Sequence, residues 1–168
     1  MILRKLQKED LPTRVLWMNN PKVYGSMHFE LPVTLGNTVR WFEKNQCNEY
    51  RYDACFEADN SVVAFGGLTS IDSVLRKAEL YVFVNPDLQG TGFGTEATGL
   101  LLGLGFGTLG LHKIYLITNE DNHAAINVYR KCGFSLEGKH RDEYLAKDGV
   151  YRDRLYFGIL SEEYGGCQ

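Results

Sequence analysis

Residues 85–97 read NPDLQGTGFGTEA, and this stretch decides how the whole sequence is interpreted. Glycines at positions 90, 92 and 94 separate a short apolar run, LYVFV at 80–84, from a long aliphatic run. The two runs predict a buried strand followed by a helix. A glycine-rich turn that leads into a helix leaves backbone N–H groups unpaired, and the helix dipole adds positive potential there. Residues 89–95 are therefore predicted to bind a phosphate or pyrophosphate, unless the glycines only form the turn.

Two common phosphate-binding motifs fit this loop poorly. A Walker loop ends in Gly-Lys-Ser/Thr, whereas Gly94 is followed by Thr95 and Glu96. The dinucleotide-binding fingerprint has the spacing G-x-G-x-x-G after the first strand of its domain. Here the spacing is G-x-G-x-G, and several predicted strands come before it. Both alternatives are therefore disfavoured.

The rest of the sequence predicts one α/β domain over residues 1–168. Strands are expected at 2–6, 53–58, 61–69, 77–84, 113–118, 133–138 and 152–160, and helices at 9–20, 35–45, 95–109 and 123–131. The first half reads as an antiparallel meander. The second half alternates strand and helix, which predicts a parallel or splayed strand pair.

Composition excludes several classes of protein. The net charge is only −3 and no basic stripe is present, so nucleic acid is not an expected partner. The apolar run at 99–111 is too short to span a membrane. Neither the four cysteines nor the four histidines show metal-ligand spacing, so no metal is expected. The charged N-terminus lacks a signal peptide, and the cysteines read as reduced thiols of a cytoplasmic protein.

Two motifs in fixed order resemble the GNAT superfamily of N-acyltransferases. Residues 89–94, QGTGFG, match the acetyl-CoA pyrophosphate loop Q/R-x-x-G-x-G/A. Residues 122–134, NHAAINVYRKCGF, resemble the second motif N-x-x-A-x-x-x-Y-x-K-x-G-F. The resemblance extends over nearly the whole chain. Further stretches, such as LRKLQKEDL at 3–11 and DGVYRD at 148–153, resemble the RimJ/RimL-like branch, which acetylates ribosomal-protein N-termini, spermidine and amino sugars.

This resemblance implies a fold and a set of acetyl-CoA contacts. The implied fold is a mixed, mostly antiparallel sheet of six to seven strands with a splayed pair, flanked by about four helices. The pantetheine arm would pair with the open edge of the strand before the loop. The implied contacts are Val82, Phe83, Val84, Gln89, Gly90, Thr91, Gly92, Phe93, Gly94, Thr95, Asn122, Ala125 and Tyr129. Asn122 is equally well interpreted as the cap of the helix at 123–131.

Two residues are predicted to move protons. Tyr129 follows Asn122 by two helical turns, so both face one side of the helix, and its phenol can protonate the departing thiolate. Without the motif it would read as a core tyrosine. Glu79 is the candidate base that accepts the amine proton. Strand alternation places it with Tyr81 and Phe83. It could instead be a structural partner of Arg76, with water as the base.

The acceptor amine is predicted only by class. A small-molecule amine, an amino sugar, a polyamine or a peptide N-terminus all fit the resemblance, and a homodimer is plausible. The candidate acceptor contacts are His28, Glu30, Tyr81 and Tyr144. The alternative function is a catalytically silent acyl-CoA-binding or sensor domain. That alternative predicts CoA binding without thiol release.

Overall fold

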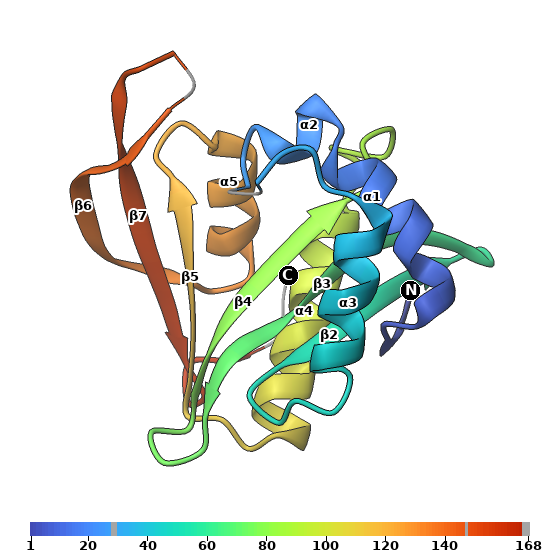
Figure 1. The fold of residues 1–168 in the computed structure, drawn as a ribbon. Coiled ribbons are helices and arrows are strands. Elements are labelled where there is room, and N and C mark those ends of the chain that lie inside the picture. The colour runs from blue at the N-terminus through green and yellow to red at the C-terminus, as the bar shows by residue number, and fades with distance from the viewer. Residues whose placement is uncertain (28–29, 147, 166–168) are drawn as a thin grey trace.

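The computed structural model describes residues 1–27, 30–146 and 148–165, and a seven-stranded sheet lies at its centre (Figure 1). The strand order is β1-β2-β3-β4-β5-β7-β6, and only β4 and β5 are parallel. The strands are β1 (Ile2–Lys5), β2 (Tyr52–Ala58), β3 (Ser61–Asp72), β4 (Lys77–Val84), β5 (Lys113–Asn119), β6 (Ser135–Leu145) and β7 (Tyr151–Leu160). The predicted mixed, mostly antiparallel sheet is confirmed.

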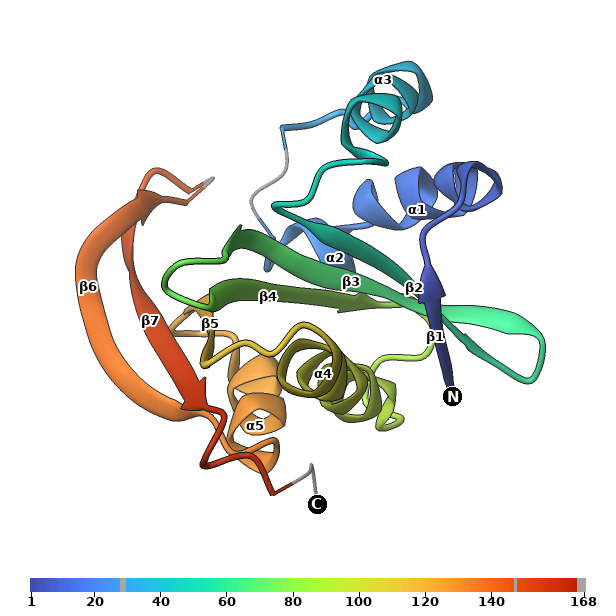
Figure 2. The ribbon, with the colours of Figure 1, turned by 90° about the horizontal axis from the view of Figure 1, so that it is seen from below.

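Five α-helices occur in the described part of the chain, one more than predicted. They are α1 (Leu11–Met18), α2 (Pro21–Tyr24), α3 (Leu35–Asn45), α4 (Phe93–Gly103) and α5 (His123–Lys131). A 3-10 turn, η1 (Lys8–Asp10), precedes α1, and a π-helical turn, η2 (Leu104–Thr108), extends α4. Figure 2 shows α1, α2 and α3 on one face of the sheet and α4 and α5 on the other. Among the described residues, none of the helices has the length and apolar character needed to cross a membrane.

Local capping explains why two helices begin where the sequence predicts. The Thr34 hydroxyl accepts a hydrogen bond from the Asn37 amide at 3.3 Å, which caps α3. The Asn122 side chain accepts one from the Ala125 amide at 3.2 Å, which caps α5. Both helices have the predicted bounds. The extra helix, α2, starts after Asn20, whose side chain accepts from the Lys22 amide at 3.0 Å.

The two faces of the sheet carry separate apolar layers. Ala78 and Leu80 of β4 are buried in the layer that includes α4 and α5. Phe83, together with half-buried Tyr81, lies in the layer that includes α1 and α3. The predicted alternation along β4 is therefore confirmed. Residues of both layers, Val82 and Val84 of one and Phe83 of the other, line the cavity described below.

The parallel pair separates after a few residues. Pairing of β4 with β5 covers Lys77–Glu79 and Lys113–Tyr115, whereas β5 continues beside β7 as far as Asn119. The second half of β4 is therefore not paired with β5, and Figure 1 shows the two strands diverging. This is the predicted splayed pair. Its free strand edge offers backbone hydrogen-bonding groups to a ligand.

The last hairpin is longer than predicted. The expected strand at 133–138 is instead β6, which extends to Leu145 and is mostly exposed. Its register against β7 shifts between Leu136 and Gly138 and again between His140 and Tyr144, and Figure 2 shows the resulting curvature. Such a polar strand has no apolar alternation for sequence reasoning to detect. Pairing with β7 holds it in place.

Candidate active site

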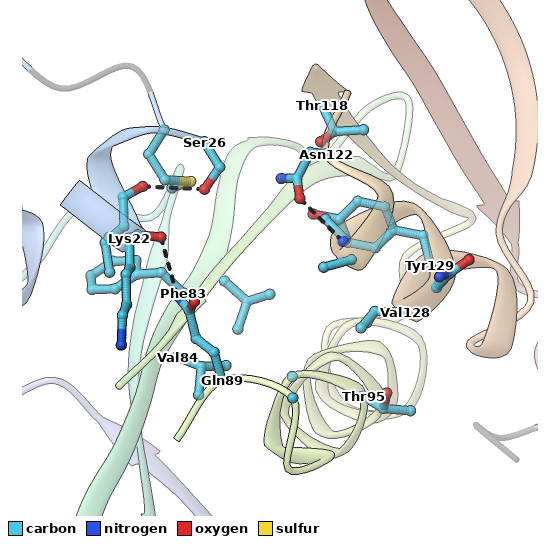
Figure 3. A pocket seen from close by; sticks show the side chains of 18 of the residues that line it. Lys22, Ser26, Phe83, Val84, Gln89, Thr95, Thr118, Asn122, Val128 and Tyr129 are labelled. Carbon is cyan, nitrogen blue, oxygen red and sulfur yellow. Dashed lines mark hydrogen bonds between the residues drawn. The ribbon is translucent and has the colours of Figure 1, made fainter. Parts of the chain in front are cut away.

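A cavity of about 650 Å³ lies where β4 and β5 separate (Figure 3). Its walls are the unpaired half of β4, the end of β5, the glycine loop, α5, and α2 with the residues that follow it. In Figure 3, Lys22 and Gln89 lie on one side of the cavity, and Asn122 and Tyr129 lie on the other. The two sequence motifs thus form opposite sides of one site.

The glycine loop has the geometry of an anion cradle. Gly90 has φ +82° and Gly92 has φ +95°, and a Cβ built on either would meet no atom within 4 Å. Within the described residues, the backbone amides of residues 89–94 donate to no backbone carbonyl. Gly92 also caps the N-terminus of α4, where the helix dipole is positive. Open space, free donors and positive potential together fit the pyrophosphate of an acyl carrier.

Most of the predicted acetyl-CoA contacts line this cavity. Those that do are Val82, Phe83, Val84, Gln89, Gly90, Gly92, Gly94, Thr95, Asn122, Ala125 and Tyr129. Thr91 and Phe93 do not. The Thr91 hydroxyl donates to the Leu88 carbonyl at 2.6 Å, and Phe93 packs against the apolar layer below the loop. Both alternatives for Asn122 are compatible, because it caps α5 and also faces the cavity.

Tyr129 is held rigidly on α5. It is 8% exposed, and its ring packs against Phe134 and Phe157 at centroid distances of 5.9 and 6.0 Å. Burial raises the pKa of Tyr129 to about 12, and the nearby Cys132 adds to this shift. The phenol therefore keeps its proton at neutral pH. It can donate to a developing thiolate but cannot serve as a base.

Glu79 lies at the last paired position before the strands separate, beside Tyr115 of β5. It does not line the cavity. Burial raises the pKa of Glu79, and the positive charge of Arg154 on β7 opposes that shift. The expected structural alternative, Arg76, instead donates to the Gly110 carbonyl at 2.9 Å. Arg154, a residue distant in sequence, is therefore the charge that acts on Glu79.

The three predicted acceptor residues that the structure describes do not gather at the cavity wall. His28 lies outside the described residues, and Glu30 is exposed. The Tyr81 hydroxyl turns away and donates to Asp53 at 2.5 Å. Tyr144 is half-buried on β6. None of the three described residues lines the cavity.

Lys22 and Asp121 are among the charged wall residues that sequence reasoning missed. Asp121 directly precedes the second motif, so its position could have been inferred from Asn122. Lys22 reaches the glycine loop only because α2 folds over it, and no local pattern indicates that. The charges of both residues influence which charged ligands the cavity can bind.

A strand split beside an anion cradle, with a buried phenol across the cavity, is the arrangement that the resemblance to N-acyltransferases implies. Comparison with known proteins gives the family. Residues 1–135 match the acetyltransferase (GNAT) domain, and the chain belongs to the GNAT acetyltransferase family.

The relatives extend this match over the full fold. Spermidine N(1)-acetyltransferase of Escherichia coli K12 is 32% identical over 96% of this chain and 87% of its own length. The enzyme of the same name from Vibrio cholerae is 30% identical over 98% and 95%. A crystal structure of Vibrio cholerae spermidine N-acetyltransferase in complex with CoA and spermine superposes with a TM-score of 0.91 and 28% identity, covering 97% of this chain and 96% of the other.

This protein is accordingly an acetyl-CoA-dependent N-acetyltransferase that acts on an amine. The silent acyl-CoA-binding alternative is not favoured, because the relatives that match along the whole chain are enzymes. The acetyl group comes from the thioester of acetyl-CoA.

Proposed function

We propose that the acceptor is a polyamine such as spermidine, acetylated on a primary amine by direct attack in a ternary complex. One observation carries this proposal. The phosphate cradle and Tyr129 line a single cavity, and two spermidine N(1)-acetyltransferases match this chain over nearly its whole length. The resemblance to the RimJ/RimL-like branch, which includes spermidine acetylases, also supports it.

One carboxylate of the cavity wall supports a cationic acceptor. Asp121 is an exposed carboxylate on the wall beside Asn122. Its negative charge adds to the raised pKa of Tyr144, after burial of that phenol, while Arg152 and Arg154 act in the opposite direction. Tyr144 belongs to β6, so Asp121 lies on the side of the cavity nearer to the curved hairpin. An ammonium group at this position would gain attraction from Asp121 without being fully dehydrated.

The proposed roles of Tyr129 and Glu79 follow from their protonation states. The amine nitrogen forms the new bond to the acetyl carbon, the bond from that carbon to sulfur breaks, and Tyr129 donates its proton to the sulfur. The amine loses a proton, which we assign to Glu79 acting through water because Glu79 does not line the cavity. A carboxylate whose pKa is raised by burial accepts that proton more readily than an ordinary one.

An acceptor screen tests the proposed function. The measurement is thiol release from acetyl-CoA with spermidine, spermine, putrescine, glucosamine and a peptide with a free N-terminus. We expect kcat/KM for spermidine or spermine to exceed that for glucosamine and the peptide by at least about 10-fold, a selectivity that charge pairing can provide. A preference for the peptide or the amino sugar would contradict the polyamine assignment. Acetyl-CoA binding without thiol release across the panel would restore the silent alternative.

Replacing Glu79 with glutamine is expected to change the pH profile of the reaction. A base must be deprotonated, so kcat should rise as pH increases through the pKa of Glu79, which burial places above its ordinary value. The glutamine side chain cannot titrate, so this acid limb should disappear and kcat should fall by about 10- to 100-fold. A wild-type acid limb that persists in Glu79→Gln would exclude Glu79 as the base.

The control for this variant is Glu49→Gln in an exposed loop, which should retain the wild-type profile. A change in fold stability should not account for the lower kcat of Glu79→Gln. A carboxyl with a raised pKa stabilises the fold below its unfolded pKa, and that contribution is lost as pH rises through the folded pKa. At neutral pH, Glu79→Gln should therefore lower the free energy of unfolding only slightly.

A further inference from the structure

Helix α2 is tied to the glycine loop by the two ends of Lys22. The Gln89 side-chain amide donates to the Lys22 carbonyl at 3.1 Å, and Gln89 is the first residue of the pyrophosphate motif. The Lys22 ammonium in turn donates to the Pro86 carbonyl at 3.2 Å. Figure 3 shows Lys22 beside Gln89 at the cavity wall. A lysine from the N-terminal half of the chain is thus held next to the anion cradle.

The Lys22 ammonium is weakly paired in this position. Its nearest carboxylate, Asp87, is 3.9 Å away, and the two side chains are 59% and 89% exposed. An exposed ion pair at this distance contributes little to stability. The ammonium can therefore leave Asp87 and the Pro86 carbonyl and bind a more highly charged anion with little loss of stability. A phosphate in the neighbouring loop would be such an anion.

The cradle supplies less positive charge than its ligand requires. Backbone amides and the α4 dipole together amount to about half an elementary charge, whereas a pyrophosphate diester carries two negative charges. In the described residues, the lysines that line the cavity are Lys22 and Lys131. Lys131 ends α5 on the other wall, while Lys22 lies beside Pro86–Asp87, at the start of the loop.

We propose that Lys22 binds the pyrophosphate of acetyl-CoA as a point charge that completes the glycine cradle. In this arrangement Gln89 has two functions. Its main chain belongs to the loop, and its side chain holds Lys22 in place through the Lys22 carbonyl. The inference depends on the use of acetyl-CoA and not on the identity of the acceptor.

Binding of three carriers without any amine tests this role. Acetyl-CoA contains the pyrophosphate and the 3′-phosphate, acetyl-3′-dephospho-CoA contains only the pyrophosphate, and S-acetylpantetheine contains neither. For Lys22→Gln we expect the dissociation constants of the first two, measured by calorimetry, to rise by the same factor, about 10-fold. The affinity for S-acetylpantetheine, measured by NMR titration, should not change. Lys22→Arg should recover most of the affinity, because it restores the charge.

The matched control is Lys44→Gln on α3, an exposed lysine that does not line the cavity and should bind all three carriers normally. The melting temperature of Lys22→Gln should equal that of the wild type, since the existing ion pair is weak. A loss confined to acetyl-CoA would assign Lys22 to the 3′-phosphate and overturn the proposal. Unchanged binding of both nucleotides would also overturn it. Because no amine is present, neither result depends on whether the acceptor is a polyamine.

Discussion

Tyr129→Phe should lower kcat by about 100-fold and leave the dissociation constant of acetyl-CoA within about 2-fold of wild type. The substitution removes one hydroxyl and keeps the ring that packs on Phe134 and Phe157. Affinity for the carrier should survive, because the cradle and the strand edge provide most of the contacts. The loss should therefore appear in the chemical step, measured as thiol release at saturating concentrations of both substrates.

The pH dependence separates an acid from a structural phenol. Burial raises the pKa of Tyr129 to about 12. Deprotonation of Tyr129 should therefore cause no decline in the kcat of the wild-type enzyme up to about pH 10. The acid role also predicts that Tyr129→Phe retains more activity with an acetyl donor whose thiol has a low pKa, since such a leaving group needs no proton. Tyr50→Phe, at an exposed tyrosine, is the control. Undiminished turnover in Tyr129→Phe would remove the acid assignment.

The elements and contacts that sequence reasoning located correctly are those with local causes. The bounds of α3 and α5 follow from the caps Thr34 and Asn122, which act within their own first turn. The glycine loop is likewise encoded by neighbouring residues. Strand β6 has no such signal, because its exposed residues are held by pairing with β7.

The same distinction applies to the site. Tyr129 and Asn122 come from one helix, and their spacing places them on one wall of the cavity. The charges that act on the site come from distant segments. Arg154 reaches Glu79 because β7 lies beside β5, and Lys22 reaches the loop because α2 folds over it. Neither relation can be inferred without the topology. The Arg76 guanidinium, the alternative partner suggested for Glu79, donates to the Gly110 carbonyl in this structure.

The second large effect is on stability, at a glycine that lets the central strands approach. Gly67 of β3 lies between Asp53 of β2 and Tyr81 of β4. A Cβ built there would overlap the Tyr52 carbonyl oxygen and lie 2.9 Å from Cε1 of Tyr81. The carbonyl belongs to a paired strand and cannot move freely. Gly67→Ala must therefore displace β2 or β4, and β4 carries the wall of the active site.

We expect Gly67→Ala to lower the free energy of unfolding by about 3 kcal/mol, which corresponds to a fall in melting temperature of about 10 °C. Gly36→Ala is the matched control, because at this exposed position of α3 the nearest neighbour of the Cβ, the end of the Arg40 side chain, would be 4.0 Å away. That variant should gain up to about 1 kcal/mol through better helix propensity. The two substitutions are thus expected to change the free energy of unfolding in opposite directions. If Gly67→Ala melted like the wild type, β3 could not be packed as tightly against β2 and Tyr81 as this structure places it.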